Sequence, residues 1–337
     1  MTDLTVAVLG VTGAVGREML RVLEERRFPI GRLVPLASPR SAGRTVTFRG
    51  VEHPVEAVRP EAFEGVDVAL FSAGGGTSRE WAPVAAARGA LVIDNSSAWR
   101  RDPEVPLVVP EANGDAALQP PKGIIANPNC STIQMVVALA PLHRAARVRR
   151  VVVSTYQAIS GAGARAVEAF EGQVRATMDG EPIEEAELTG CLAGNLLMHW
   201  PPAPEGGHLT EELKMVHETR KILGDEGIRV SPTTVRVPVL RGHALSMAVE
   251  LDEPLSAERA RVLLGSAPGI EVVDDLAEGR YPQPIHAAGR DPVYVGRIRE
   301  DPGLPGGLLL WCVADNLRKG AALNAIQIAE HRQRAAA

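Results

Sequence analysis

The stretch LTVAVLGVTGAVGREML, residues 4–20, decides the fold of the chain. It opens with a short run of aliphatic and β-branched residues that ends in glycine, which is typical of a buried strand. Residues 14–28, AVGREMLRVLEERRF, then place apolar side chains at helical spacing. The order strand, tight turn, helix is half of a βαβ unit and predicts that the chain begins with a parallel sheet.

Glycines fill the turn between this strand and this helix. Gly10, Gly13 and Gly16 follow a G-x-x-G-x-x-G spacing, which departs from the G-x-G-x-x-G pattern of many dinucleotide-binding turns. Backbone close to a pyrophosphate and a free helix N-terminus favour a dinucleotide here, although tight packing of a helix on a strand also selects glycine. The predicted cofactor-binding residues of the turn are Gly10, Thr12, Gly13, Ala14, Val15 and Gly16.

The end of the second predicted strand bears on which dinucleotide binds. An NAD site usually has an acidic residue there to accept the ribose hydroxyls, but this strand ends in LASPRSAGR, residues 36–44. Ser38 and Arg40 stand where the carboxylate would be. A hydroxyl and a guanidinium suit a 2′-phosphate, which favours NADP; the alternative is that Arg40 is a solvated loop residue.

The rest of the chain predicts an α/β protein with two domains. Strand-like runs at 31–38, 66–75 and 90–97 and a helical run at 78–89 continue the alternation of a Rossmann-type, doubly wound parallel sheet. The predicted dinucleotide-binding domain covers 1–127 together with a C-terminal helix at about 314–337, and residues 128–313 form the second domain. Its helix at 130–146, its alternating runs at 148–158, 227–251 and 292–300 and its irregular segment at 180–209 predict an α+β domain with a mixed sheet.

Composition narrows the function classes. A net charge of -5 and a pI of about 6.0 argue against a nucleic-acid partner, which would need a basic face. The three cysteines are too scattered for a disulfide framework or a zinc cluster, so no metal site is expected. No basic segment leads into a signal-type apolar run, and no stretch reaches the roughly 18 apolar residues of a membrane span. These features predict a cytoplasmic protein without a membrane partner.

Cys130 lies in IIANPNCSTIQ, residues 124–134, at the start of the helix predicted for 130–146. In a first helical turn the unpaired N–H groups and the positive end of the dipole stabilise a thiolate. Pro128 fixes the entry of the chain, and Asn129 is placed to cap the helix. The alternative for any isolated cysteine is a buried structural role, which is the interpretation kept for Cys191 and Cys312.

Several motifs together resemble the aspartate-β-semialdehyde dehydrogenase family. They are GVTGAVGREML, NPNCSTIQ, YQAISGAG, EELKMVHETRKIL, VRVPVLRGHA and YVGRIRED, and they follow the family's order over nearly the whole chain. The resemblance implies a homodimer or homotetramer, with residues 128–313 as the catalytic and dimerisation domain. It implies the reversible, NADP-dependent conversion of L-aspartyl-4-phosphate to L-aspartate-4-semialdehyde and inorganic phosphate, in the synthesis of lysine, methionine, threonine and diaminopimelate.

The resemblance also implies roles for single residues. Cys130 matches the nucleophile that forms a thioester, His243 the general acid/base, Gln157 the residue that orients the substrate, and Arg236 the clamp on its α-carboxylate. The remaining substrate-binding matches are Glu211 for the amino group, Lys214 and Arg100 for phosphate, and Asn129, Ser160 and Gly161 near the ligands. The remaining cofactor-binding matches are Ser72, Ala73, Gly74 and Asn316.

Some assignments leave alternatives. Glu212 and Arg101 are the alternatives to their neighbours Glu211 and Arg100, and an exposed ion pair is the usual explanation for Glu211 and Lys214 at i and i+3. Thr210 is predicted to cap their helix. Arg236 and His243 are an odd number of positions apart, so a straight strand would put them on opposite faces unless the chain turns near Gly242.

The sequence departs from the family in one segment. Two alternatives to the function that the resemblance implies also stay open. Where many members have a motif like FNVIP, this chain reads AGNLLMHWPP around Asn195, which puts the role of residues 172–208 in doubt. One rival is an N-acetyl-glutamyl-phosphate reductase, but Glu211 favours a free amino group. The other is a catalytically silent NADP-binding protein, which would not need a nucleophile matched with an acid/base.

Overall fold

The computed structural model describes residues 3–186, 190–198 and 206–336. The chain divides into two compact units. Unit 1 consists of Met1–Asn129 with Gly320–Ala337, and unit 2 consists of Cys130–Lys319.

Unit 1 is built on a parallel sheet of six strands among its described residues. In sheet order these are β5 (Glu56–Ala57), β2 (Ile30–Ala37), β1 (Leu4–Leu9), β6 (Val68–Phe71), β7 (Leu91–Asp94) and β8 (Ile124–Ala126). The chain starts in the middle with β1 and moves outward first on one side and then on the other. This is the doubly wound order of dinucleotide-binding domains.

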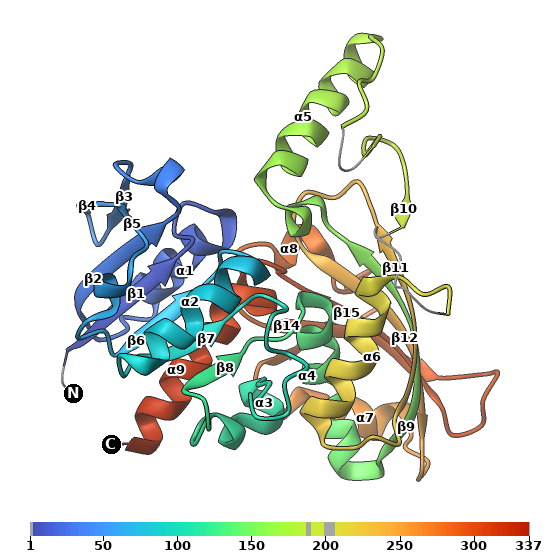
Figure 1. Cartoon of the computed structure of the whole chain (residues 1–337). Coiled ribbons are helices and arrows are strands. Elements are labelled where there is room, and N and C mark those ends of the chain that lie inside the picture. The colour runs from blue at the N-terminus through green and yellow to red at the C-terminus, as the bar shows by residue number, and fades with distance from the viewer. Residues whose placement is uncertain (1–2, 187–189, 199–205, 337) are drawn as a thin grey trace. The chain divides into compact units, whose positions relative to one another are not determined.

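Short helices and a hairpin complete unit 1. They are α1 (Ala14–Glu25), α2 (Gly75–Ala87), α3 (Pro110–Asn113), α9 (Leu323–Ala336), the 3₁₀ turns at Pro39–Ser41, Pro60–Phe63 and Gly114–Ala117, and the hairpin of β3 (Thr45–Phe48) and β4 (Val51–Pro54). In Figure 1 the red helix α9, from the end of the chain, lies with the blue and cyan elements from its beginning.

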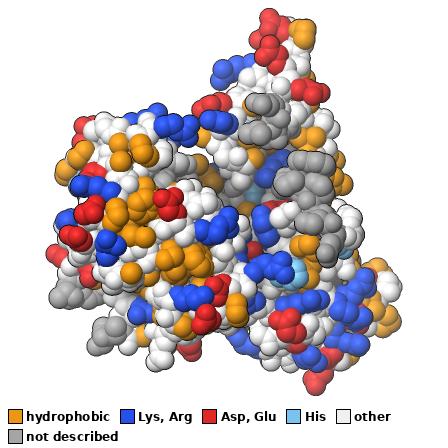
Figure 2. Space-filling model, in the orientation of Figure 1, with side chains coloured by type: hydrophobic (Ala, Val, Ile, Leu, Met, Phe, Trp, Pro, Cys, Tyr) orange, Lys and Arg blue, Asp and Glu red, His pale blue; other side chains and the backbone are white. Residues whose placement is uncertain are grey.

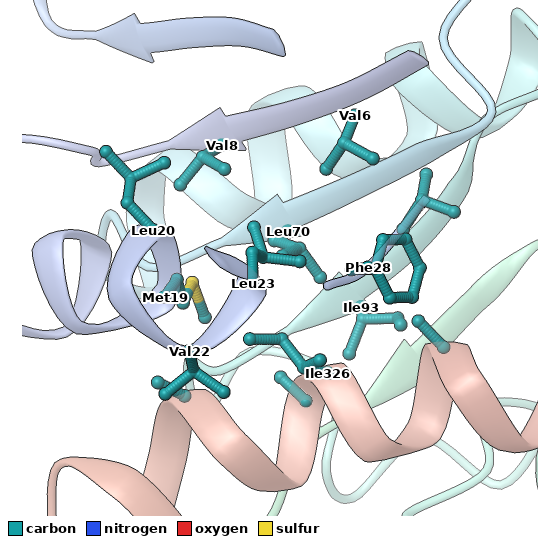
Figure 3. Packing of buried hydrophobic residues seen from close by; sticks show 14 of the residues in the cluster. Val6, Val8, Met19, Leu20, Val22, Leu23, Phe28, Leu70, Ile93 and Ile326 are labelled. Atoms are coloured by element: carbon teal, nitrogen blue, oxygen red, sulfur yellow. The ribbon is translucent and has the colours of Figure 1, made fainter. Parts of the chain in front are cut away.

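The core of unit 1 joins segments that are far apart in the sequence. Figure 3 shows Val6 and Val8 of β1 facing Met19 and Leu23 of α1, with Ile326 of α9 packed against the same cluster. All five side chains are at most 1% exposed. Burying such side chains contributes about 1.5–3 kcal/mol each, so α9 is part of this fold rather than an appendage.

Unit 2 contains a mixed sheet of seven strands among its described residues. In sheet order these are β10 (Leu197–Met198), β11 (Arg229–Arg236), β9 (Val148–Gln157), β12 (His243–Leu251), β15 (Leu308–Ala314), β14 (Val293–Glu300) and β13 (Ile270–Val272). Its helices are α4 (Cys130–Ala146), α5 (Ala164–Asp179), α6 (Thr210–Leu223), α7 (Ala257–Gly265) and α8 (Pro284–Ala287), with a 3₁₀ turn at Ile159–Ala162; a π-helical turn, Arg318–Ala322, leads out of the unit. The parallel and mixed sheets confirm the predicted fold class.

Helices α4, α6 and α7 pack on one face of the mixed sheet. Along β9 the side chains of Val151, Val153 and Thr155 are buried on this face, while Val152 and Tyr156 point the other way and are 40% and 41% exposed. Arg150 and Ser154 share this outer face, but large exposed apolar side chains such as Val152 and Tyr156 are unusual on a sheet face that meets water.

One buried glutamine, Gln173, bonds to four described residues of the segment predicted to be irregular. Helix α5 projects away from the mixed sheet in Figure 1, and Gln173 lies on its buried side. Its amide nitrogen donates to the carbonyls of Glu184 and Gly190, each at 2.9 Å, and its amide oxygen accepts from Leu192 N and Ala193 N at 2.7 and 3.1 Å. The Gln173 side chain therefore supplies backbone hydrogen bonds that a neighbouring strand would otherwise supply.

Candidate active site

The chain turns that follow β1 and β6 touch each other in unit 1. Gly10 has a φ of +88°, and a Cβ there would lie 2.5 Å from the carbonyl oxygen of Ser72. Strands β1 and β6 are also the point where the strand order reverses. In open α/β sheets the crevice at such a reversal, beyond the carboxyl ends of the strands, is where ligands bind. Ser72, Ala73 and Gly74 form the turn that leads from β6 into α2.

The glycines between β1 and α1 have two different roles: some allow close packing, and Gly13 leaves the start of α1 uncovered. A Cβ on Gly16 would lie 2.2 Å from Gly10 O, so the close approach of α1 to the turn after β1 requires glycine at position 16. Gly13 is the N-cap of α1, where it offers no side-chain cap, and the first turn, with Ala14 and Val15, carries no acidic residue. A phosphate can therefore meet the N–H groups and positive dipole end of α1. Thr12 lies beside them and is half-buried.

The predicted 2′-phosphate residues lie at the end of β2. Ser38 precedes the 3₁₀ turn Pro39–Ser41, and both Ser38 and Arg40 are exposed. Their position at the carboxyl end of a strand beside β1 is the one from which the second strand of a dinucleotide-binding domain contacts the adenosine ribose.

Arg100 is tied to the backbone of unit 1. Its Nε donates to Asn127 O and its Nη2 to Asn95 O, both at 2.9 Å, and the residue is 8% exposed. The neighbouring Arg101 is exposed. Since a guanidinium presents its five N–H groups in a rigid fork, these two bonds fix the orientation of Arg100. The buried Asn129 ends unit 1 and directly precedes α4.

Four strands of unit 2 bring their ends together at one edge of the mixed sheet. The carboxyl ends of the parallel strands β9 and β11 are paired there, Gln157 with Arg236. Strand β12 runs antiparallel to β9 and therefore begins at this edge with His243, which pairs with Ala314, the last residue of β15. Arg236 and His243 lie on separate strands, and the connection between them includes Gly242 with a φ of +95°. The predicted turn near Gly242 is therefore confirmed.

Helix α4 packs on this sheet and begins with Cys130. The thiol is partly exposed, while most of the helix that follows is buried. Its place in the first turn is the one in which the helix dipole stabilises a thiolate. Cys312 on β15 is fully buried, and burial raises the pKa of its thiol far above the ordinary value.

Arg236 lies within electrostatic reach of Cys130. Burial lowers the pKa of the Arg236 guanidinium, and the nearby Cys130 and Glu211 act in the opposite direction by favouring the charge. Its Nη1 donates to Ala158 O at 2.6 Å. A partly buried guanidinium fixed on one side in this way is suited to bind a carboxylate on the other side.

His243 is fully buried, and its tautomer is set by the backbone. Its Nδ1 accepts a hydrogen bond from Ala158 N at 2.9 Å, so a neutral imidazole carries its proton on Nε2. The 3₁₀ turn Ile159–Ala162 lies against the same ring: a Cβ on Gly161 would be 3.2 Å from His243 Nε2 and 2.9 Å from Arg236 Nη1. Only glycine leaves both groups in place.

A chain of polar contacts connects the end of β9 with α6. Thr155 donates to Gln157 Oε1 at 3.0 Å, which turns the Gln157 amide nitrogen toward Glu211 Oε1 at 3.4 Å. Lys214 Nζ lies 2.7 Å from Glu211 Oε2. Glu211 and Lys214 therefore share a face of α6, as the i, i+3 spacing predicted, and both belong to the same edge of the sheet as Arg236.

Glu212 has a different task. Its carboxylate accepts from Leu209 N at 2.9 Å and from Thr234 N at 3.3 Å, so it caps α6 and ties the helix to β11. The prediction that Thr210 caps α6 was wrong: Thr210 is the first helical residue, and Leu209 occupies the N-cap position. The acidic side chain three residues on satisfies the backbone donor at that position instead.

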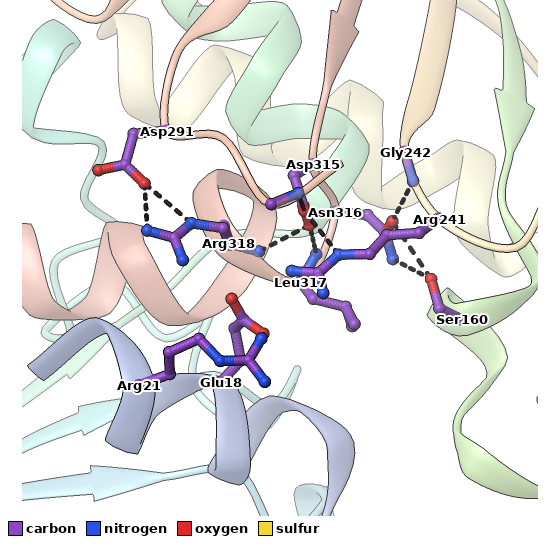
Figure 4. Close-up of polar contacts among 11 residues, drawn as sticks. Glu18, Arg21, Ser160, Arg241, Gly242, Asp291, Asp315, Asn316, Leu317 and Arg318 are labelled. Atoms are coloured by element: carbon purple, nitrogen blue, oxygen red, sulfur yellow. Dashed lines mark hydrogen bonds and ion pairs between the residues drawn. The ribbon is translucent and has the colours of Figure 1, made fainter. Parts of the chain in front are cut away.

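Asn316 joins two turns beside the imidazole. Its Oδ1 accepts from Gly242 N at 2.9 Å, and its Nδ2 donates to Ser160 Oγ at 3.0 Å (Figure 4). The structure thus places Asn316 in unit 2, whereas the other predicted cofactor-binding residues lie in unit 1.

Unit 2 therefore brings together Cys130, Gln157, Ser160, Gly161, Glu211, Lys214, Arg236, His243 and Asn316. Unit 1 holds Arg100, Asn129 and the residues predicted to bind the dinucleotide. Thr155, Arg241 and Asp315 hold these side chains in place and were not predicted as site residues. The position of Asp315 at the start of a predicted helix was the one local signal that could have found it.

Two further findings concern the described part of the chain as a whole. Within residues 3–186, 190–198 and 206–336, no group of three or more His, Cys, Asp or Glu side chains is arranged to hold a metal ion. No helix of the same residues has the length and apolar character needed to cross a membrane. Figure 2 shows acidic and basic side chains interspersed over the visible surface.

Sequence models of two protein-family domains match the chain. The semialdehyde dehydrogenase NAD binding domain matches residues 5–119, and the semialdehyde dehydrogenase dimerisation domain matches residues 139–319. A nicotinamide-dinucleotide-binding domain is therefore present, and it lies in unit 1.

Known relatives match over nearly their full length. The aspartate-semialdehyde dehydrogenase of Aquifex aeolicus is 55% identical over 328 residues, which is 96% of each chain. The structure of aspartate semialdehyde dehydrogenase II of Vibrio cholerae, complexed with ASA, has a TM-score of 0.96 at 45% identity and covers 99% of each chain. The enzyme of Candida albicans, whose structure was determined with NADP, has a TM-score of 0.79 at 25% identity and covers 98% of this chain and 99% of its own.

Proposed function

The chain belongs to the aspartate-semialdehyde dehydrogenase family, and from that premise we propose that it interconverts L-aspartyl-4-phosphate and L-aspartate-4-semialdehyde, with NADP as cofactor and a thioester on Cys130 as intermediate. The observation that carries the proposal is the grouping at one sheet edge of unit 2. A thiol at a helix N-terminus, a buried imidazole, a partly buried guanidinium and a carboxylate paired with an ammonium group meet there.

The charged groups suit an amino acid with a reactive side chain. Arg236 offers a bidentate partner for an α-carboxylate, and Glu211 offers an acceptor for an α-amino group. Gln157, held between Thr155 and Glu211, orients the substrate beside the sulfur. An N-acetylated substrate has no charge to meet Glu211, which favours the aspartate compound over the N-acetyl-glutamate compound.

The reaction divides into two transfers. The Cys130 thiolate attacks the acyl carbon of aspartyl phosphate, a C–S bond forms, the C–O bond to phosphate breaks, and phosphate leaves with the bonding electrons. When bound, NADPH supplies the hydride that the acyl carbon then accepts. The charge that develops on the carbonyl oxygen is stabilised by His243 through its Nε2 proton, and cleavage of the C–S bond releases the aldehyde and restores the thiolate. The acid/base role of His243 stays a prediction.

The residues of unit 1 fit the pyrophosphate and the ribose of the cofactor. The first turn of α1, which has no side-chain cap and no acidic residue, suits the pyrophosphate, and the glycines of the turn before it suit a close approach to backbone. Ser38 and Arg40 support NADP over NAD, since they present a hydroxyl and a guanidinium to a 2′-phosphate. Asn316 keeps its proposed place near the nicotinamide amide. For phosphate we propose Lys214 and Arg100.

The outer face of the mixed sheet supports a homodimer. Val152 and Tyr156 are 40% and 41% exposed there, and the rings of Tyr156 and Trp311 lie 5.4 Å apart. Contiguous exposed apolar side chains usually mark an interface. If a second copy covers this face, Tyr156→Asp shifts the protein toward monomers in analytical ultracentrifugation, and the wild type reveals whether dimers pair into tetramers. An unchanged sedimentation coefficient would place the interface elsewhere.

The biological setting follows from the reaction. We propose a role in the synthesis of lysine, methionine, threonine and diaminopimelate. A reducing compartment such as the cytoplasm suits the three free cysteines and a thiolate mechanism.

The test is phosphate-dependent reduction of NADP with L-aspartate-4-semialdehyde, run beside NAD and beside N-acetyl-glutamate semialdehyde. Turnover only with the aspartate compound and NADP supports the proposal, and turnover with the acetylated compound overturns the substrate. Cys130→Ala is expected to lose turnover by more than about 1,000-fold while binding NADP as the wild type does. A silent binding protein would bind NADP and turn over neither aldehyde.

A further inference from the structure

The turn that leads into His243 is held by two consecutive residues, Asp315 and Asn316. Gly242 donates its N–H to Asn316 Oδ1 at 2.9 Å, and the preceding Arg241 donates through Nε to Asp315 Oδ2 at 2.6 Å (Figure 4). Both residues that precede the imidazole in the chain are thus fixed from the end of β15. A Cβ on Gly242 would lie 3.0 Å from Pro284, so the turn is also packed against α8.

Asp315 is completely buried, and its carboxylate accepts four hydrogen bonds. Its Oδ1 accepts from Leu317 N and Arg318 N at 2.8 and 3.0 Å, and its Oδ2 accepts from Gly289 N at 2.6 Å as well as from Arg241. A buried carboxylate is retained at low cost only when its oxygens are satisfied in this way. An amide of the same shape would turn an N–H group toward one of these donors, so the site requires a carboxylate.

From this arrangement we propose that Asp315 is a positioning residue for His243. It fixes Arg241 directly, and it fixes Asn316 through the Leu317 and Arg318 N–H groups that define their common turn. Asn316 in turn holds Gly242 and Ser160, next to the two sides of the imidazole. The inference rests on the proposed function, in which the Nε2 proton of His243 must meet the carbonyl oxygen of the substrate, and a misplacement of about 1 Å can cost about 100-fold in rate.

Asp291, which contacts the turn that contains Asp315, provides a matched control. Asp291 forms an ion pair with Arg318, with Oδ1 2.6 Å from Nη2 and 2.9 Å from Nε. Asp291→Asn therefore weakens a carboxylate–guanidinium contact beside the same turn and leaves in place the four hydrogen bonds that Asp315 accepts. Asp315→Asn is expected to lower kcat about 10- to 100-fold, and Asp291→Asn to change it less than about twofold.

The experiment measures kcat, KM and the pH profile of both variants, together with the alkylation rate of Cys130 by iodoacetamide. Positioning predicts a lower kcat for Asp315→Asn, a KM for the semialdehyde within about threefold of wild type and an unchanged alkylation rate, because Arg236, Glu211 and the start of α4 are untouched. It also predicts a changed pH profile. Equal kcat values for the two variants, or losses of kcat and alkylation in equal proportion, would overturn the proposal.

Two additional measurements keep the proposal testable. If Asp315→Asn does not fold, Arg241→Gln removes the same contact from its partly exposed partner and is expected to show the same loss of kcat, which Arg241→Lys restores in large part. The imidazole ¹⁵N resonances of His243 report its tautomer without any substrate. A shift of these resonances in Asp315→Asn but not in Asp291→Asn supports positioning, whether or not the wild type turns over an aldehyde. A wild type without turnover would overturn only the proposed function. Identical resonances in the two variants and the wild type would overturn positioning.

Discussion

Gly161 is the residue at which the candidate site tolerates the least added volume. A methyl group there would lie 2.9 Å from Arg236 Nη1 and 3.2 Å from His243 Nε2, while the backbone itself is not in the left-handed region. Because the first atom to yield is the end of a flexible side chain, we expect Gly161→Ala to change the free energy of unfolding by less than about 1 kcal/mol. We expect kcat/KM to fall by about 10- to 100-fold, since both groups are displaced.

Gly172→Ala is the control for Gly161→Ala. Gly172 lies inside α5, and a Cβ there has no neighbour within 4 Å. This substitution is expected to leave steady-state kinetics unchanged and to stabilise the protein by about 0.5–1 kcal/mol, because alanine has the higher helix propensity. Full activity of Gly161→Ala would show that the ring and the guanidinium can move without loss.

The three cysteines are expected to differ in reactivity. Iodoacetamide at pH 7 should modify Cys130 at least about tenfold faster than Cys191. Both thiols are partly exposed, but only Cys130 lies at a helix N-terminus. Cys312 should react only after unfolding, since it is fully buried and burial raises its pKa. Mass spectrometry of timed samples measures the order, and Cys130→Ala should remove the fast phase. If Cys191 were alkylated as fast as Cys130, the helix dipole would not explain the reactivity of Cys130.

The extent to which the sequence predicted the site depends on the distance along the chain. Cys130 at a helix start and Glu211 with Lys214 on one face could be predicted, because each depends on a few neighbouring residues. The contact of Gly161 with Arg236 and His243 could not, since it depends on the pairing of β11 and β12 on either side of β9. The role of Arg241 depends on contacts between separate turns and leaves no mark in local spacing, whereas Asp315 carried only the local signal of its place before a predicted helix.

The last turn of α4 contains a histidine whose pKa is lowered. Burial is the main cause for His143; the attraction of Asp225 opposes it without cancelling it. The neutral form is also used structurally, because Nδ1 accepts from Val148 N at 3.1 Å. The unfolded chain therefore binds the proton first as the pH falls, and stability is lost from about pH 6.5 down to the lowered pKa of the folded protein.

His143→Asn is expected to reduce this acid sensitivity. Asparagine keeps an acceptor for Val148 N but does not titrate. The difference in the free energy of unfolding between pH 7.5 and pH 5, from urea titrations, should therefore be smaller in the variant than in the wild type. Equal differences would show that protonation of His143 is not linked to unfolding.

Helix α5 shows why some elements were missed while others were predicted. The strand and helix of residues 4–25 follow from strong periodicity and a glycine turn, whereas α5 buries the polar Gln173 among its few buried positions. That glutamine bonds to the backbone of Glu184, Gly190, Leu192 and Ala193, a role that hydrophobic periodicity does not detect. Similarly, the cap of α6 comes from Glu212 within the helix rather than from the Thr210 predicted before it.

At the scale of the whole molecule, unit 1 closes only with the last segment of the chain. Residues Ala322, Leu323, Ile326 and Ile328 are buried in the same core as β1 and α1. The amphipathic pattern of residues 316–335 predicted a helix, but periodicity alone does not say which sheet a helix covers. During synthesis the dinucleotide-binding unit therefore stays incomplete until all of unit 2 has been made.

A substitution in α9 is consequently expected to destabilise a fold whose first strand lies more than 300 residues earlier in the chain. Ile326 is 0% exposed, and Ile326→Ala should lower the free energy of unfolding of unit 1 by about 2–5 kcal/mol. Val51→Ala serves as control in the same unit, because Val51 is 57% exposed and its loss should cost less than about 0.5 kcal/mol. Urea unfolding followed by tryptophan fluorescence measures both, since Trp81 and Trp99 report on unit 1. If α9 did not complete the core, the two variants would unfold at the same urea concentration. NADP would then also bind Ile326→Ala and the wild type equally at the urea concentration where Ile326→Ala is expected to be half unfolded.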